Sequence, residues 1–234
     1  MIAVTPEVQL RTMFVLDGRG RIGTSPEPNV PSAPLFALIR GASSCASAVR
    51  ADLPESVAAE VERLARRERP LVDLQIPNDT PANADTYLAL LGGQINSGPA
   101  FTFPDRIASS SDVALVDRLE MLERHFRGWV AAEIPWRAPI VAVMDGGYPV
   151  SVCFCATKAS ENTVEAGLET APAFRGRGFA PRVTSAWASA IRASGRIPLY
   201  STSWTNSASR AVARKLGLIQ YAVDWTIVEP THQK

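Results

Sequence analysis

The chain has 234 residues, of which 46% are hydrophobic, so it can build at least one sizeable core. Its 24 Lys and Arg residues nearly balance 23 Asp and Glu residues, and the formal net charge of +1 excludes a strong overall field for nucleic acid or anionic membranes. The segment from Met1 to Pro6 lacks the features of a signal peptide, and no apolar run approaches the ~18 residues of a membrane helix. We therefore expect a cytoplasmic protein.

The region of residues 1–97 is predicted to be a small mixed α/β domain of unknown role. Its expected elements, in chain order, are a strand over 12–17 with a turn at 17–20, a proline-rich connection, a buried strand over 35–39, a helix that opens at 53–56, and a helix over 85–91. Charged residues on the first of these helices are explained by a solvated face.

The second predicted domain covers residues 98–234, with the boundary close to residue 97. Its expected elements are a strand over 98–103, a helix from 111 to 126, a helical piece over 129–134 ended by Pro135, strands over 140–144, 148–156 and 163–170, a helix over 180–194, a strand over 198–203, a helix over 207–216, and a strand over 220–228.

Cysteine and histidine content argues against disulfides and metals. The three cysteines form no CxxC pair, and only two histidines, His125 and His232, are present, so we expect no metal. Cys153 and Cys155 alternate in a strand pattern, which favours two buried thiols on one face over a catalytic thiol.

A glycine-rich, basic turn, Arg175-Gly-Arg-Gly-Phe-Ala180, joins the strand over 163–170 to the following helix. Amide N–H groups at a helix start lack internal partners and carry the positive end of the helix dipole, so this turn could wrap a pyrophosphate. It is neither a Walker motif nor a G-x-G-x-x-G dinucleotide fingerprint, and it occurs once rather than as a nucleic-acid-binding RG repeat.

The turn fits the pattern Arg/Gln-x-x-Gly-x-Gly/Ala and so resembles the coenzyme A pyrophosphate motif of the GNAT acyltransferases. A second segment, in which Asn206 leads a helix that closes in Lys-Leu-Gly217, resembles the next strand and helix of that family. The resemblance covers about residues 98–228. It implies an α/β GNAT fold with a mixed, mostly antiparallel central sheet, splayed parallel strands and flanking helices.

Three motifs, Glu-Ala-Gly-Leu-Glu-Thr, Arg-Gly-Arg-Gly and Tyr-Ser-Thr-Ser-Trp, further resemble a poorly characterised GNAT branch that includes an antibiotic self-resistance acetyltransferase. The family resemblance implies acetyl-CoA as cosubstrate and no metal. Carried onto this sequence, the implied cofactor-binding residues are Thr170, Ala171, Arg175, Gly176, Arg177, Gly178, Phe179, Ala180, Asn206 and Ser209. Asn206 is explained equally well as a helix cap.

Transfer to an amine needs a proton acceptor, for which Glu165 and Glu169 are the candidates. They are four residues apart on one predicted strand, hence on one face and about 13 Å apart, too far for a dyad. One could act as base while the other orients the substrate, and a solvated or salt-bridged face explains either equally well. Main-chain N–H groups of residues 169–171 are implied to stabilise the oxyanion.

The tyrosine that protonates the departing thiolate in many GNAT enzymes is replaced by Ala213, which leaves Tyr200, Ser209 or water as the acid. These features predict an N-acetyltransferase that acts on the primary amine of a small molecule, with no nucleic-acid or membrane partner and with a homodimer left open. A protein or peptide N-acetyltransferase and a non-catalytic acyl-CoA-binding protein are the alternatives, and the missing tyrosine favours the second of these. The acceptor pocket is expected to involve residues 98–138 and the N-terminal unit.

Overall fold

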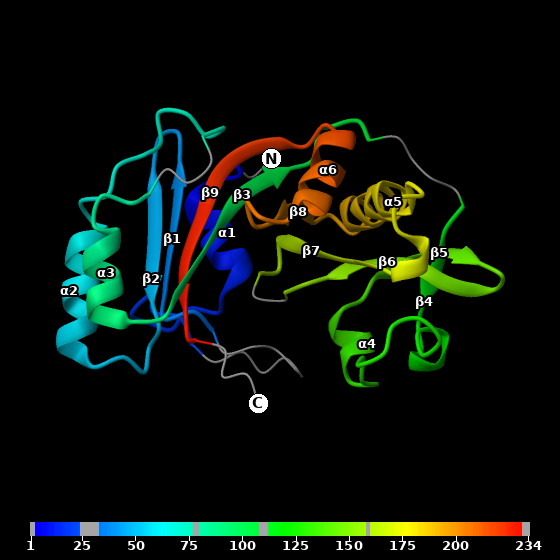
Figure 1. Ribbon diagram of the computed structural model, residues 1–234, viewed down its shortest axis with the longest axis horizontal. Coiled ribbons are helices and arrows are strands. Elements are labelled where there is room, and N and C mark those ends of the chain that lie inside the picture. The colour runs from blue at the N-terminus through cyan, green and yellow to red at the C-terminus, as the bar shows by residue number, and fades with distance from the viewer. Residues whose placement is uncertain (1–2, 24–32, 77–79, 108–111, 158–159, 231–234) are drawn as a thin grey trace.

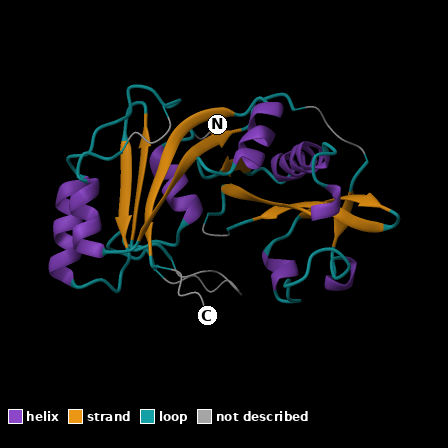
Figure 2. Ribbon diagram, viewed as in Figure 1, coloured by secondary structure: helices purple, strands orange, loops and turns teal. Residues whose placement is uncertain are grey.

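The computed structural model describes residues 3–23, 33–76, 80–107, 112–157 and 160–230. Figures 1 and 2 show the arrangement. The α-helices are α1 (Pro6–Met13), α2 (Glu55–Ala65), α3 (Ala84–Leu91), α4 (Glu133–Trp136), α5 (Phe179–Ala193) and α6 (Ser207–Lys215), and the strands are β1 (Phe36–Gly41), β2 (Cys45–Val49), β3 (Gln94–Thr102), β4 (Ala114–Val116), β5 (Ile140–Asp145), β6 (Tyr148–Cys155), β7 (Thr163–Thr170), β8 (Ile197–Ser201) and β9 (Ile219–Val228).

The strands form a nine-stranded sheet in the order β2-β1-β9-β3-β8-β7-β6-β5-β4. Every neighbouring pair is antiparallel except β7 and β8, which are parallel. The long strand β9 lies between β1 and β3, so strands from both halves of the sequence alternate in the middle of the sheet (Figure 1). The predicted boundary near residue 97 falls inside β3, and the division into two domains stays a prediction.

The parallel pair is short and then separates. Residues 163–165 of β7 pair with residues 197–199 of β8, and no further pair joins these strands. The rest of β7 pairs only with β6, as far as Thr170 opposite Ser151. The predicted GNAT fold, with its mostly antiparallel sheet and splayed parallel strands, is therefore confirmed.

Alternation along the strands sends side chains to two faces of the sheet. On β1, Phe36 and Leu38 pack toward α2 and α3, whereas Ala37 and Ile39 pack in the core beneath α1. Helix α5 buries Trp187 against β5, β6 and β7, and α5 and α6 lie above these strands while α4 lies below them (Figure 1). Each face is thus covered by its own set of helices.

The predicted strand over residues 12–17 is wrong, because residues 6–13 form α1. The Thr5 Oγ1 accepts a hydrogen bond from the Val8 amide at 3.3 Å, and Pro6 occupies the first turn, where its missing N–H costs nothing. A buried contact of 2.5 Å between the hydroxyls of Thr12 and Thr163 then ties α1 to β7. The helix-start signal Thr-Pro-Glu outweighed the apolar run that follows it.

The predicted helix from 111 to 126 is also wrong. Residues 114–116 form strand β4 instead, paired with β5 at the sheet edge, and residues 119–121 form one 3-10 turn. Leu122 and Phe126 are buried in the core under this face, so the apolar spacing reflects burial and not helix. Pro135 lies inside the short α4 and does not end a helix before it.

The remaining predicted elements are confirmed with shifted ends, and the proline-rich connection falls mostly outside the described residues. Cys153 and Cys155 are both buried in the core beneath α5, and they are not joined in a disulfide. Within the described ranges, no helix has the length and apolar character needed to cross a bilayer.

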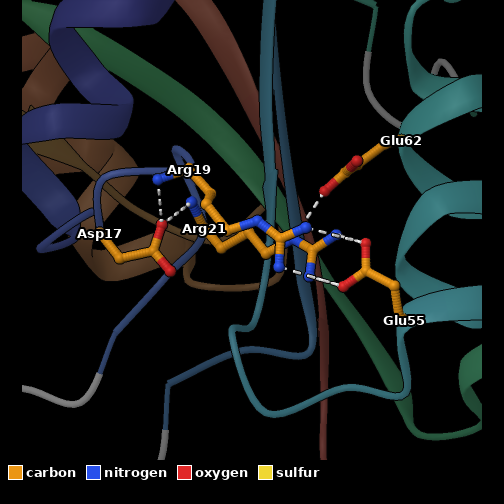
Figure 3. A network of polar contacts seen from close by, with 5 residues as sticks. All are labelled: Asp17, Arg19, Arg21, Glu55 and Glu62. Carbon is orange, nitrogen blue, oxygen red and sulfur yellow. Dashed lines mark hydrogen bonds and ion pairs between the residues drawn. The ribbon is translucent and has the colours of Figure 1, made fainter.

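A polar network ties the N-terminal turn to α2 (Figure 3). Asp17 accepts hydrogen bonds from the backbone amides of Arg19 and Arg21 at 2.8 and 2.9 Å. The Arg21 guanidinium reaches Glu55 at 2.7 Å and Glu62 at 2.9 Å, with only 6% of its side chain exposed. Because Arg21 donates to it, the pKa of Glu55 falls to about 2, so this carboxylate stays charged across the working range of pH.

Candidate active site

The divergence of β7 and β8 opens a cavity of about 860 Å³, called here the large cavity. It lies within the usual size range of small-molecule and cofactor sites. Nine of the ten predicted cofactor residues line it, all but Arg177, and so do Glu169 and Tyr200. Side chains from the end of β7, from the start of α5, from the end of β8 and from α6 therefore meet around one space.

The glycine-rich turn forms one end of the large cavity. Gly176 and Gly178 have φ values of +76° and +78°, and a Cβ built on either would meet no atom within 4 Å. Among the described residues, the amides of Gly176, Arg177 and Gly178 donate to no backbone carbonyl. Open space, free N–H groups and the start of a 15-residue helix together make this turn a fitting cradle for a pyrophosphate.

Two arginines of the turn are held near it. The Arg175 Nε donates to the Thr170 carbonyl at 3.1 Å, which folds the side chain back on the end of β7. The Arg177 guanidinium lies over the Phe174 ring, 5.1 Å from its centroid. Arg177 does not line the large cavity, so its predicted cofactor contact has no support from the lining.

At the opposite wall, Asn206 caps α6. Its Oδ1 accepts a hydrogen bond from the Ser209 amide at 3.0 Å, and both residues line the large cavity. The Ser209 hydroxyl lies 2.6 Å from the Tyr200 hydroxyl. Burial raises the pKa of Tyr200 to about 12 despite this contact, so Tyr200 is a neutral phenol with a proton to donate at neutral pH.

The end of β7 supplies a free amide toward the cavity. Ala171 does not, because its N–H donates to the Val150 carbonyl at 3.0 Å. Hydrogen-bonded and non-hydrogen-bonded pairs alternate in an antiparallel ladder, so the neighbouring Thr170 N–H points away from β6 and into the splay. Of the main-chain amides of residues 169–171 that were expected to stabilise the oxyanion, only that of Thr170 is therefore directed into the splay.

The two candidate bases lie in different surroundings. Val164 and Leu168 pack beneath α5, so Glu165 and Glu169 project from the other face of β7. Glu169 lines the large cavity, and burial raises its pKa, while Trp129 and Arg137 oppose that rise.

Glu165 is only 3% exposed and does not line the large cavity. Burial, and then the negative charge of Asp224, raise its pKa to about 8, while hydrogen bonding by Ser201 and the Gln9 side chain opposes that rise.

Several lining residues were missed by the sequence predictions. His125, Phe126 and Phe174 contribute an aromatic wall, with His125 edge-on to Phe174 at 5.3 Å between ring centroids. The segment Ser201-Thr202-Ser203 also lines the cavity, and its only signal was its place in the Tyr-Ser-Thr-Ser-Trp motif. No group of three or more metal-ligating side chains gathers within the described part of the chain.

Comparison with known proteins agrees with this geometry. Residues 140–226, from β5 to β9, match the family model described as GNAT acetyltransferase. No curated protein matches the chain significantly.

Solved structures resemble the fold at low sequence identity. A Drosophila protein aligns with a TM-score of 0.51 and 14% identity, over 83% of this chain and 74% of its own. A GNAT-family protein from Novosphingobium aromaticivorans aligns with a TM-score of 0.49 and 16% identity, over 59% of this chain. A GCN5-related N-acetyltransferase-like protein from Streptococcus suis aligns with a TM-score of 0.47 and 14% identity, over 83% of this chain and 84% of its own.

The Novosphingobium match spans 66% of that protein, just under two thirds of its length. The likeness to the Drosophila protein concerns the fold alone, whereas the family model names an activity for residues 140–226. Residues 140–226 therefore match the GNAT acetyltransferase family model, and this match supports an acetyltransferase enzyme.

Proposed function

We propose that this protein is an N-acetyltransferase that transfers the acetyl group of acetyl-CoA to a primary amine of a small molecule, a metabolite or an antibiotic, in a ternary complex. One observation carries the proposal. The large cavity runs between separated parallel strands, and an open glycine cradle at the start of α5 forms one end of it.

The chain's own groups fit the parts of such a cosubstrate. The amides of residues 176–178 and the N-terminus of α5 suit the pyrophosphate. Asn206 and Ser209 at the start of α6 line the opposite wall, where the pantetheine arm would lie. When bound, acetyl-CoA would supply the activated acetyl group, and the Thr170 amide would donate to the thioester oxygen.

Proton transfers would use groups on both sides of the splay. An ammonium must lose a proton before its nitrogen can attack, and Glu165 or Glu169 would receive it. The Tyr200 hydroxyl, bonded to Ser209, would return a proton to the thiolate when the carbon–sulfur bond breaks. Holding amine and thioester side by side supplies most of the remaining rate gain.

The protein or peptide N-acetyltransferase alternative and the non-catalytic alternative lead to different experiments. Ala213 is buried in the core beneath α5, so this position supplies no acid, and Tyr200, Ser209 or water must do so if the protein is an enzyme. Thiol release with small amines supports the proposal, and release only with peptides supports the first alternative. Saturable acetyl-CoA binding without any thiol release supports the second.

The cofactor site is tested by calorimetric titration with acetyl-CoA, dephospho-CoA and pantetheine. We expect saturable acetyl-CoA binding that weakens when the pyrophosphate is absent and that disappears in Gly178→Glu, where a carboxylate would fill the cradle. Gly20→Glu is the matched control, because Gly20 has a φ of +77° against +78° and equally open surroundings. Unchanged affinity in folded Gly178→Glu, or no binding to the parent protein at millimolar acetyl-CoA, would overturn the assignment.

A further inference from the structure

A smaller cavity of about 260 Å³ lies on the other face of the sheet and is called here the small cavity. Its walls come from α1 and from strands β1, β3 and β9, including Met13, Ile39, Ser97 and Thr226. Ile39 belongs to the core beneath α1, whereas Tyr200 of the large cavity belongs to the core beneath α5. The two cavities therefore lie on opposite faces.

The two cavities meet at one segment of chain. Ser201, Thr202 and Ser203, at the end of β8, line both of them. This is the point where β8 has already left β7, so no strand pairing closes the gap beside it. A group bound in the small cavity would thus share the wall of residues 201–203 with a group bound in the large one.

The small cavity contains an acidic centre without cationic partners among the described residues. Asp224 lines it, with its Oδ2 accepting from the Gln9 side chain at 3.2 Å and its Oδ1 buried without a hydrogen-bond partner. The buried carboxyl of Glu165 lies close enough for the two charges to interact, with Ser201 and the Gln9 side chain beside it. The Tyr221 hydroxyl donates to the Gln9 side-chain oxygen.

We propose that the small cavity binds the acceptor of the reaction, a primary amine with an apolar body, and that Asp224 receives its ammonium group. The inference rests on the proposed function and names its substrate class. The Asp224 Oδ1 is buried without a donor, so it needs a hydrogen-bond donor or a cation, and a ligand ammonium is both. The apolar walls and the volume, about nine times that of a liquid water, suit a body of roughly ten non-hydrogen atoms.

The chemistry balances without any further reactant. In this arrangement Asp224 takes the place of Glu165 or Glu169 as the base: the ammonium gives one proton to the Asp224 carboxylate, the freed nitrogen attacks the thioester carbon, and a carbon–nitrogen bond forms. As the carbon–sulfur bond breaks, the attacking nitrogen releases its second proton to solvent, and the thiolate takes a proton from the Tyr200 and Ser209 pair, which later regains one from solvent. The products are the amide, coenzyme A and the proton released from Asp224.

The titration of the acidic centre agrees with this role. Burial raises the pKa of Asp224 to about 7, and burial together with Asp224 raises the pKa of Glu165 to about 8. The pair therefore gains and releases protons near neutral pH, where a base that alternates between its two forms is most effective.

The test measures amine binding separately from acetyl-CoA binding. Phenethylamine and n-hexylamine serve as probes, with 2-phenylethanol as the neutral control, and saturation-transfer NMR and thiol release are the readouts. In Asp224→Asn we expect amine affinity to fall about tenfold or more, the loss of a hydrogen bond to a charged group, while acetyl-CoA affinity stays unchanged. The matched control is Asp145→Asn, since Asp145 is exposed and lines neither cavity.

A second variant guards against misfolding of the first. Thr226→Phe places a ring in the small cavity without altering a carboxylate, and it should also abolish amine binding. Amine binding that survives in either folded variant would overturn the inference, and so would the absence of binding by both probes to the parent protein at millimolar concentration. If the parent protein binds the amine probes but does not bind acetyl-CoA, the proposed function is rejected instead.

Discussion

Gly98 lies where β3 crosses the segment shared by the two cavities, and its replacement by alanine is the sharpest steric test of the structure. A Cβ on this residue would lie 1.7 Å from the Thr202 carbonyl oxygen and 2.6 Å from the Ser203 Cα. These are backbone atoms and cannot rotate away. Because real Cβ atoms essentially never approach below 3.0 Å, β3 and residues 202–203 must separate by more than 1 Å.

Overpacking of this kind costs about 1 to 3 kcal/mol. For a chain of this length, that cost corresponds to a fall in Tm of roughly 2 to 12 °C, and the displaced segment should also weaken acetyl-CoA binding. Differential scanning fluorimetry and calorimetric titration measure the two effects. Gly18→Ala is the matched control, because Gly18 has an ordinary φ and no atom within 4 Å of its Cβ position. If Gly98→Ala melts and binds like Gly18→Ala, the close contact described here does not exist.

Two further predictions concern charge. The pKa of Asp224 rises from 3.8 to about 7 and that of Glu165 from 4.5 to about 8 on folding, so the folded protein holds protons that the unfolded chain has released. The stability that these held protons contribute is fully present below about pH 4 and is lost as the pH rises to about 8. In urea titrations, the free energy of unfolding should therefore fall between pH 5 and pH 8 in the parent protein, and Asp224→Asn should remove the part of that fall that Asp224 causes. If the free energy of unfolding of the parent minus that of Asp224→Asn increases with pH, this prediction is contradicted. Separately, Arg21→Met should lower the Tm more than Arg19→Met, because the Arg21 side chain is 6% exposed and joins two glutamates whereas that of Arg19 is 66% exposed; equal losses would contradict the network in Figure 3.

The second half of the fold followed closely from sequence pattern. The strand over 163–170 and the helix from 179 to 193 have strong periodicity and an unambiguous glycine turn between them, so local chemistry alone locates them. The helix in residues 6–13 and strand β4 were missed, because short apolar runs fit either type of element and tertiary pairing decided between them.

Prediction of the candidate site was limited in a similar way. The cofactor residues cluster in two motifs, and nine of them line one cavity. Asp224 escaped notice because an acid in an alternating strand normally faces solvent, and nothing local reveals that β9 runs beside β3. Asp224 lies near Glu165 only because of the order of the strands in the sheet, and the local sequence pattern of a strand does not reveal that order.

The position of β9 also has a consequence for how the protein is made. Strands β1 and β3 are synthesised early, yet both find their shared neighbour only in residues 219–228. Until the ribosome releases that segment, two strand edges have unmet hydrogen bonds and the wall that carries Asp224 is missing. The small cavity therefore cannot form before β9 pairs with both strands.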